Sequence, residues 1–238
     1  MIKRFATFLF IVFIFSGRGV AQDSNTIQNW FDYTQINRIS GNWSYLGDYA
    51  FRFQIATTES EWWQIFARPS FIFKNKAIYD LRGGIMFKFT NTVEGNGFEI
   101  RPWQGAKVYW PNFGRFRFQN YFRAEQRFEI ELDTDESNFV FKLRYKLSTN
   151  IPINNPIITS KTFYVLIGYE LFFNLSRDNE EFIDDRTRFN IGVGYRFNPK
   201  TDLRLQYLFQ KSRVNLEEIS NSNDHIIRIS VIQRFGLE

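Results

Sequence analysis

Apolar and polar residues alternate with a period of two along most of this chain, and this alternation constrains the fold more than any other feature of the sequence. Successive side chains of a β-strand point to opposite faces of the sheet, so the pattern predicts strands with one apolar and one polar face. A weaker candidate of the same kind covers residues 29–38. The clear segments are 43–55, 63–73, 77–89, 98–108, 115–131, 139–147, 163–173, 187–197, 203–209 and 225–235.

Charged side chains fall on only one of the two faces of these ten segments. The apolar faces contain 61 residues, none of which is Asp, Glu, Lys or Arg. The polar faces contain 53 residues, of which 18 are Lys or Arg and 7 are Asp or Glu. Two architectures separate charges in this way: a soluble sandwich or barrel with an apolar interior, and a transmembrane barrel with an apolar exterior and a polar lumen.

Segment length and aromatic content favour the transmembrane barrel. Most segments have about 9 to 13 residues, as a tilted strand needs to cross a bilayer, whereas strands of soluble proteins average about 5 to 6. We therefore predict an all-β fold, a transmembrane antiparallel β-barrel of 10 to 12 strands with an apolar outside and a charged lumen. Closed bacterial barrels usually have an even strand number, so we expect both termini on one side. Aromatic residues expected at the lipid headgroups are Trp43, Trp62, Trp63, Trp103, Tyr109, Trp110 and Phe113.

The N-terminal residues predict export. Two basic residues precede the apolar run 5–15, and small residues lie just before Gln22, as is typical of a cleaved signal peptide. The apolar run is too short for a membrane-spanning helix, which needs about 20 residues. We therefore expect residues 1–21 to be removed and residues 22–238 to form a single barrel domain in the bacterial outer membrane.

Amino-acid composition limits the kinds of binding partner that we expect. Without the expected leader, 27 basic residues stand against 25 acidic ones, so the net charge is about +2 and gives no support for a nucleic-acid partner. The chain has no cysteine, which excludes disulfides, thiol chemistry and Cys-ligated metal sites. We expect contacts with outer-membrane lipid, lipopolysaccharide and the outer-membrane assembly machinery, and we expect no cofactor and no metal.

Two motifs resemble a known bacterial family. The stretches FEIRPWQGAKVYWP (98–111) and YFRAEQRF (121–128) are similar to the Glu-x-Arg-x-Trp-Gln and Arg-x-Glu-x-Arg pattern of domain of unknown function 2490. The resemblance covers most of residues 28–236 and implies an uncharacterised outer-membrane-type β-barrel without established catalytic residues. Such barrels often end on an aromatic residue, whereas Phe235 is followed by three further residues here.

The inward charges are the candidate functional residues. Two interpretations of them stay open: the buried charges pair for stability alone, or their arginine excess attracts anions, as rings of Arg or Lys do in anion-selective pores. Between residues 116 and 132, Arg and Glu alternate with apolar residues, mostly Phe. The predicted lumen charge network consists of Arg52, Arg82, Glu99, Arg101, Arg117, Arg123, Glu125, Arg127, Glu129, Arg144 and Arg188.

Three classes of function stay open on this basis. The chain is a narrow, porin-like channel favouring small anionic solutes, a non-conducting structural or assembly-related barrel, or an outer-membrane lipid-modifying enzyme. The enzyme has the least support, because the only histidine, His225, falls on an apolar face without a Gly-x-Ser-x-Gly motif. We therefore predict that the protein is not an enzyme and has no catalytic residue.

Connection lengths predict an orientation. Outer-membrane barrels keep their periplasmic turns short and their external loops longer. Short connections such as KNKA, WPNFGR and NPKT alternate with the longer TNTVEGNG, LSRDNEEFIDD and SRVNLEEISNSND. This alternation places the C-terminal end in the periplasm. The link STNIPINNPIITSK (148–161) is long for that side and contains two prolines.

Overall fold

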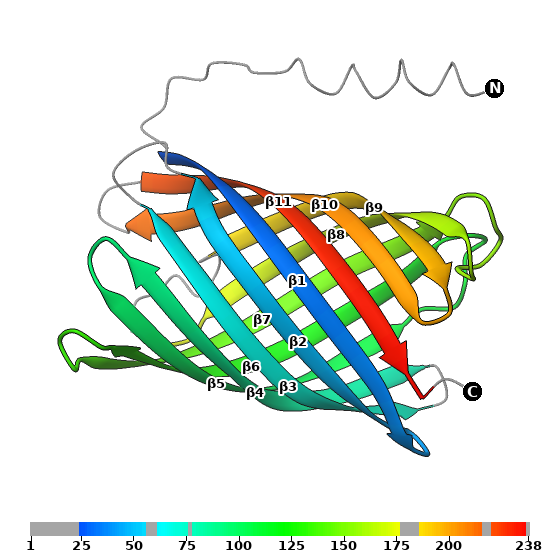
Figure 1. The fold of residues 1–238 in the computed structure, drawn as a ribbon, viewed down its shortest axis with the longest axis horizontal. Helices are drawn as coiled ribbons and strands as arrows, with labels where there is room; N and C mark the ends of the chain where they lie inside the picture. Colours follow the sequence, from blue (N-terminus) through cyan, green and yellow to red (C-terminus); the bar gives the residue numbers. More distant parts are fainter. Residues whose placement is uncertain (1–23, 56–60, 76–77, 177–185, 216–219, 237–238) are drawn as a thin grey trace.

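The described part of the chain is one closed β-barrel (Figure 1). It confirms the predicted all-β fold and has eleven strands, within the expected range. None of the described residues belongs to a helix that could cross a membrane. The expected leader lies outside the described residues. The computed structural model describes residues 24–55, 61–75, 78–176, 186–215 and 220–236.

The strands coincide closely with the alternating segments. Eight of the ten clear segments lie wholly within one strand, and the other two begin two residues before their strands. The weak candidate at 29–38 lies within the first strand. In chain order the strands are β1 (Ser24–Ser40), β2 (Trp43–Ile55), β3 (Trp62–Asn75), β4 (Tyr79–Thr92), β5 (Asn96–Tyr109), β6 (Arg117–Glu131), β7 (Ser137–Pro152), β8 (Thr162–Asn174), β9 (Arg186–Asn198), β10 (Thr201–Asn215) and β11 (Ser220–Phe235).

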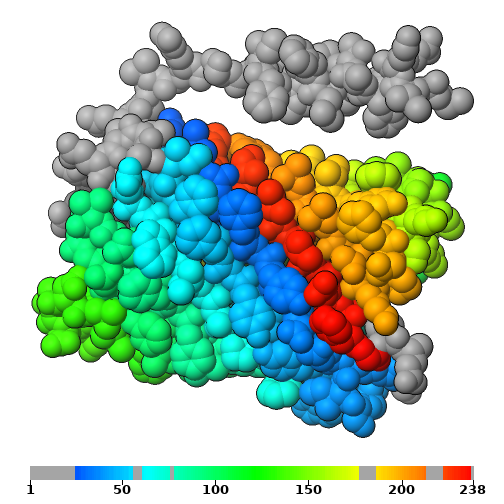
Figure 2. Space-filling model, in the orientation of Figure 1, coloured from blue at the N-terminus to red at the C-terminus, as the bar shows by residue number. Residues whose placement is uncertain are grey.

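The barrel closes through a parallel pair, β1 with β11. Phe31 of β1 lies opposite Ile229 of β11 in parallel register and opposite Phe51 of β2 in antiparallel register. Figure 1 shows β1 (blue) and β11 (red) side by side and pointing the same way, and Figure 2 shows their side chains in contact along the surface. With an odd number of strands in up-and-down order, the first and last strands must point the same way, so the closure is parallel.

The expectation of an even strand number with both termini on one side is therefore wrong. Ser24 lies at one end of the barrel and Phe235 at the other, and we call these the N-terminal and C-terminal ends. The signal for β1 is weak because its outward positions include the polar residues Asn29, Gln35 and Asn37.

The strands are strongly tilted. Residues that lie directly opposite one another on neighbouring strands form a path from each strand to the next. This path of partners starts four residues before the end of β1, near the C-terminal end of the barrel, and reaches the last residue of β8, at the N-terminal end. This stagger corresponds to a tilt of about 40° and a backbone radius of about 11 Å. Inward arginine side chains therefore reach over much of the distance to the barrel axis. The path passes through Ile36, Leu46, Ser70, Gly84, Trp103, Glu125, Lys142 and Asn174.

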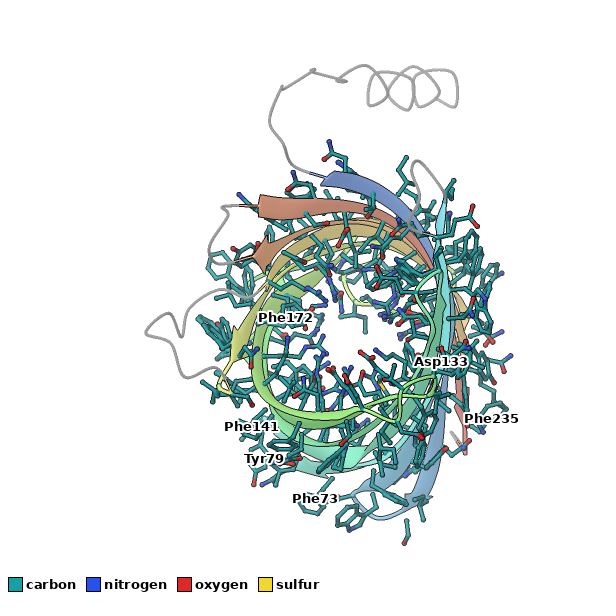
Figure 3. The ribbon with its side chains drawn as sticks, turned by 90° about the vertical axis from the view of Figure 1, so that its left-hand side faces the viewer. Phe73, Tyr79, Asp133, Phe141, Phe172 and Phe235 are labelled. Carbon is teal, nitrogen blue, oxygen red and sulfur yellow. The ribbon has the colours of Figure 1, made fainter. Side chains whose placement is uncertain are left out.

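The two faces of the wall differ as the alternation predicts. Outward apolar side chains are exposed, as Phe51 and Ile191 are at 43% each. Figure 3, a view along the barrel, shows Phe172 inside the wall and Phe73 and Phe235 outside it. The apolar face is therefore the exterior and the charged face lines the lumen.

Two of the described connections are shorter than the sequence suggests. At the N-terminal end, β4 and β5 are joined by only Val93 to Gly95. At the C-terminal end, β7 continues to Pro152, so the β7–β8 link shortens to residues 153–161. The β4–β5 connection is therefore as short as the predicted periplasmic turns, and the 148–161 link is less of an exception on its side. Most of the predicted external loop LSRDNEEFIDD (175–185) lies outside the described residues.

Candidate functional site

A cavity of about 1050 Å³ occupies the barrel, and all eleven strands contribute to its lining. Lining residues include Lys74 and Tyr109 near the C-terminal end and Thr26 and Trp62 near the N-terminal end. Nitrogen-tipped side chains point from the wall into this space (Figure 3). The candidate site is therefore the lumen itself, from one end to the other.

Glu125 on β6 is the centre of the charge network in this lumen. Its side chain is 0% exposed and lies within ion-pair distance of four guanidinium groups. The shortest nitrogen–oxygen distances are 3.2 Å to Arg101, 3.0 Å to Arg123, 2.6 Å to Arg127 and 2.8 Å to Arg144. Because a buried carboxylate is costly unless it is paired, these four arginines allow Glu125 to be ionised inside the wall.

The network continues along the wall in both directions. Arg144 also contacts Glu170 on β8 at 2.6 Å, and Glu170 contacts Arg188 on β9 at 3.4 Å. On the other side, Arg101 is hydrogen-bonded to Glu99 on its own strand. Six cations and three carboxylates therefore form one connected group across β4 to β9. This central network consists of Lys88, Glu99, Arg101, Arg123, Glu125, Arg127, Arg144, Glu170 and Arg188.

Aromatic rings that face the lumen contact several of the guanidinium groups. Arg123 lies 4.2 Å from the centroid of the Trp103 ring, and Arg144 lies 4.6 Å from that of Phe172. Such cation–π contacts are attractive and restrict the arginine rotamers. The expected place at the lipid headgroups is wrong for Trp62, Trp103 and Tyr109, because their side chains line the lumen; Trp103 is 3% exposed.

Seven of the eleven predicted network residues belong to the central network, and four do not. Arg52 and Arg82 face inward but pair elsewhere, with Asp32 at 4.0 Å and with Asp80 at 2.6 Å. Arg117 donates to the Asn112 side chain at the C-terminal end of the barrel, 3.0 Å away. Glu129 has no ion pair with any described residue. The seven are Glu99, Arg101, Arg123, Glu125, Arg127, Arg144 and Arg188.

Several inward carboxylates were not among the predicted residues. Asp32 on β1 is hydrogen-bonded to Arg228, and its strand was only a weak candidate. Asp202, the second residue of β10, lies one residue before the predicted segment and accepts hydrogen bonds from Arg196 (2.7 Å) and Arg234 (2.9 Å). Alternate residues of a strand face the same side. When this alternation is extended over the full length of each strand, the sequence places these residues inside.

Arg196 also ties the β7–β8 link to the wall. Its Nη1 donates to the Ile158 carbonyl at 2.9 Å, while its Nε is bound to Asp202. The link is therefore fixed to the lumen side of the wall at the C-terminal end.

His225 faces the exterior. Its Nδ1 lies 2.7 Å from the Tyr207 hydroxyl, and the Phe209 ring packs beside it. Within the described part of the chain, no group of three or more His, Cys, Asp and Glu side chains is arranged to hold a metal ion.

Comparison with known proteins relates the chain to a family whose description contains no activity. Residues 27–218 match the family described as "Protein of unknown function (DUF2490)". The matched region includes the whole central network and both motifs that suggested the resemblance. No curated protein matches the chain.

Proposed function

We propose, from the premise that the chain belongs to the DUF2490 family, that it is an outer-membrane β-barrel whose lumen conducts small anions. The observation that carries this proposal is the cavity of about 1050 Å³, lined by every strand and rich in Arg and Lys. The predicted leader and the apolar outer face support an outer-membrane location.

Strand length also supports insertion in a membrane. The shortest strands, β2, β8 and β9, have 13 residues each. At a tilt of about 40°, such a strand rises about 33 Å, which exceeds the apolar band of about 25 Å on outer-membrane barrels. The proposed surroundings of the wall are therefore lipid and lipopolysaccharide, and the assembly machinery would insert the barrel.

The sign of the lumen charge supports anions as the solutes. The central network has twice as many cations as carboxylates. Walls of low dielectric constant focus such a field onto a water-filled path. Arginine side chains inside a backbone cylinder of about 11 Å radius leave a narrow bore, so the solutes would be small.

Reversal potentials across a planar bilayer with a salt gradient test the proposal. We expect the wild-type protein to prefer anions, and Arg123→Gln/Arg127→Gln to shift the selectivity towards cations. This double variant keeps Glu125 paired with Arg101 and Arg144, so we expect it to fold. Cation preference in the wild type, or unchanged selectivity in the variant, would refute an arginine-lined anion path.

The other two classes are outcomes of the same experiment. A correctly folded barrel without conductance would favour the non-conducting structural or assembly-related role. The lipid-modifying enzyme has the weakest support, because the polar partner of the only histidine among the described residues is the Tyr207 hydroxyl.

A further inference from the structure

Two lysines in the lumen lack a carboxylate partner. Lys107 on β5 and Lys146 on β7 line the cavity and are half-buried. Neither makes an ion pair or a hydrogen bond with a described residue; the nearest ring to the Lys107 ammonium is Tyr109, at 5.7 Å. They differ in this respect from the cations of the central network, each of which contacts a carboxylate.

The carboxylates closest in register are already occupied. Asp80 on β4 lies opposite the β5 lysine, and Glu170 on β8 lies opposite the β7 lysine. Asp80 is bound by Arg82 at 2.6 Å, and Glu170 is bound by Arg144 at 2.6 Å. Arg82 and Tyr109 both bind Oδ2 of Asp80, and two arginines take both oxygens of Glu170. Neither lysine makes an ion pair with the carboxylate opposite it.

Tyr121 on β6 stands between the two lysines. It is directly paired with Lys107 on one side and with Lys146 on the other. Neighbouring strands lie about 4.8 Å apart, so the two lysine Cα atoms are about 10 Å apart. Two flexible four-carbon side chains can therefore bring both ammonium groups to one small ion between them.

The Tyr121 hydroxyl is available as a further donor. It has no hydrogen bond to a described residue, and its ring lies against Gly105. A Cβ at Gly105 would lie 3.1 Å from the ring and 2.6 Å from the Phe122 carbonyl oxygen, so this glycine makes room for the ring.

More positive charge surrounds this part of the lumen. Three cations, Arg82, Lys146 and Arg204, act electrostatically on the Lys107 ammonium against one carboxylate, Asp80. Arg204 lies 3.9 Å from Asp202, so its charge is only loosely paired. Unpaired like charges repel one another in a narrow space, and a bound anion would remove this repulsion.

We propose that Lys107, Tyr121 and Lys146, the lysine row, form a binding site for a small doubly charged oxyanion such as phosphate. The site provides two ammonium groups and one hydroxyl as donors, in the half of the lumen nearer the C-terminal end. This inference rests on the proposed function in one respect: phosphate can reach the site only if the lumen is open to solvent. It adds a specific point of anion contact, the unpaired lysines, to the arginine-lined path.

Calorimetric titration of the folded barrel in detergent with inorganic phosphate, at constant ionic strength, tests the site without requiring conductance. We expect the wild-type protein to bind phosphate, and Lys107→Gln/Lys146→Gln to bind at least about tenfold more weakly, because charge-assisted hydrogen bonds are lost. The matched control is Arg52→Gln/Arg186→Gln, which removes the same charge from the half of the lumen nearer the N-terminal end and leaves the lysine row intact. We expect this control to change the affinity by less than about threefold.

Each outcome separates the site from the channel. Absence of phosphate binding in the wild type, or equal weakening in the two double variants, would overturn the lysine row as a specific site. Lys107→Arg/Lys146→Arg should retain phosphate binding, because this variant keeps both charges. The proposed site would also be overturned if the Arg variant lost binding while the Gln variant kept it. Phosphate binding by a barrel that does not conduct would support the site and contradict the proposed channel.

Discussion

Buried arginines in this barrel are held by two kinds of contact at the scale of single residues. Arg123 both pairs with Glu125 and stacks on Trp103, and Arg144 pairs with two carboxylates and stacks on Phe172. Glu125 is the carboxylate that both arginines share. Removal of one arginine leaves this carboxylate paired, whereas removal of the carboxylate leaves four cations close together.

We therefore expect Glu125→Gln to destabilise the folded barrel by about 3 to 5 kcal/mol, the usual effect of leaving buried charges unpaired. Urea unfolding of the protein in lipid vesicles, followed by tryptophan fluorescence, measures the change. The control is Glu129→Gln on the same strand and the same face, which removes no ion pair with a described residue. We expect this control to lie within about 0.5 kcal/mol of the wild type. Equal unfolding midpoints for the two variants would contradict the central role of Glu125.

At the scale of strands, the alternation predicted which side chains face the lumen but not where strands end or which charges meet. β4 continues to Thr92 and β7 to Pro152, because backbone pairing with a neighbour does not require alternating side chains at strand ends. Residue parity placed Glu125 and Arg144 on the same face, but their contact depends on the register between β6 and β7. That register, like the pairing of Asp32 with Arg228 across the barrel closure, is a property of the assembled wall.

The assignment of exterior and lumen faces can be tested by placing one charge on either side of the wall. Ile191 lies near the middle of β9 on the exterior and is exposed, whereas Gln64 on β3 lines the cavity. If lipid covers the exterior, we expect Ile191→Arg to cost about 2 to 4 kcal/mol and Gln64→Arg much less. The same unfolding measurement in vesicles compares the two. Similar losses for both variants would argue against lipid contact at Ile191.

At the scale of the whole molecule, the two ends of the barrel carry different charges. Described connections at the N-terminal end contain only acidic charges, and those at the C-terminal end contain only basic ones. The C-terminal end is also the one nearer the lysine row, so small anions would meet an attractive field from that side. The acidic residues are Glu61, Glu94, Asp133, Asp135 and Glu136; the basic residues are Arg115, Lys161 and Lys200.

The parallel closure is the feature of the whole molecule that sequence patterning missed, and cysteine pairs can test it directly. In the parallel register, Ile27 lies opposite His225 and Tyr33 lies opposite Val231, all on the exterior. Neighbouring strands are about 4.8 Å apart, within the range that a disulfide spans. The chain has no cysteine, so each engineered pair is the only possible cross-link within it.

We therefore expect Ile27→Cys/His225→Cys and Tyr33→Cys/Val231→Cys both to form a disulfide on mild oxidation of the folded barrel. The cross-link closes a loop of most of the chain, so the denatured protein should change its mobility on non-reducing gels. The exchanged pairs, Ile27→Cys/Val231→Cys and Tyr33→Cys/His225→Cys, are the controls. They are six residues out of register, about 20 Å along the strands, and should stay unlinked. An antiparallel closure about the same centre would reverse this result, linking the exchanged pairs and leaving the first two free.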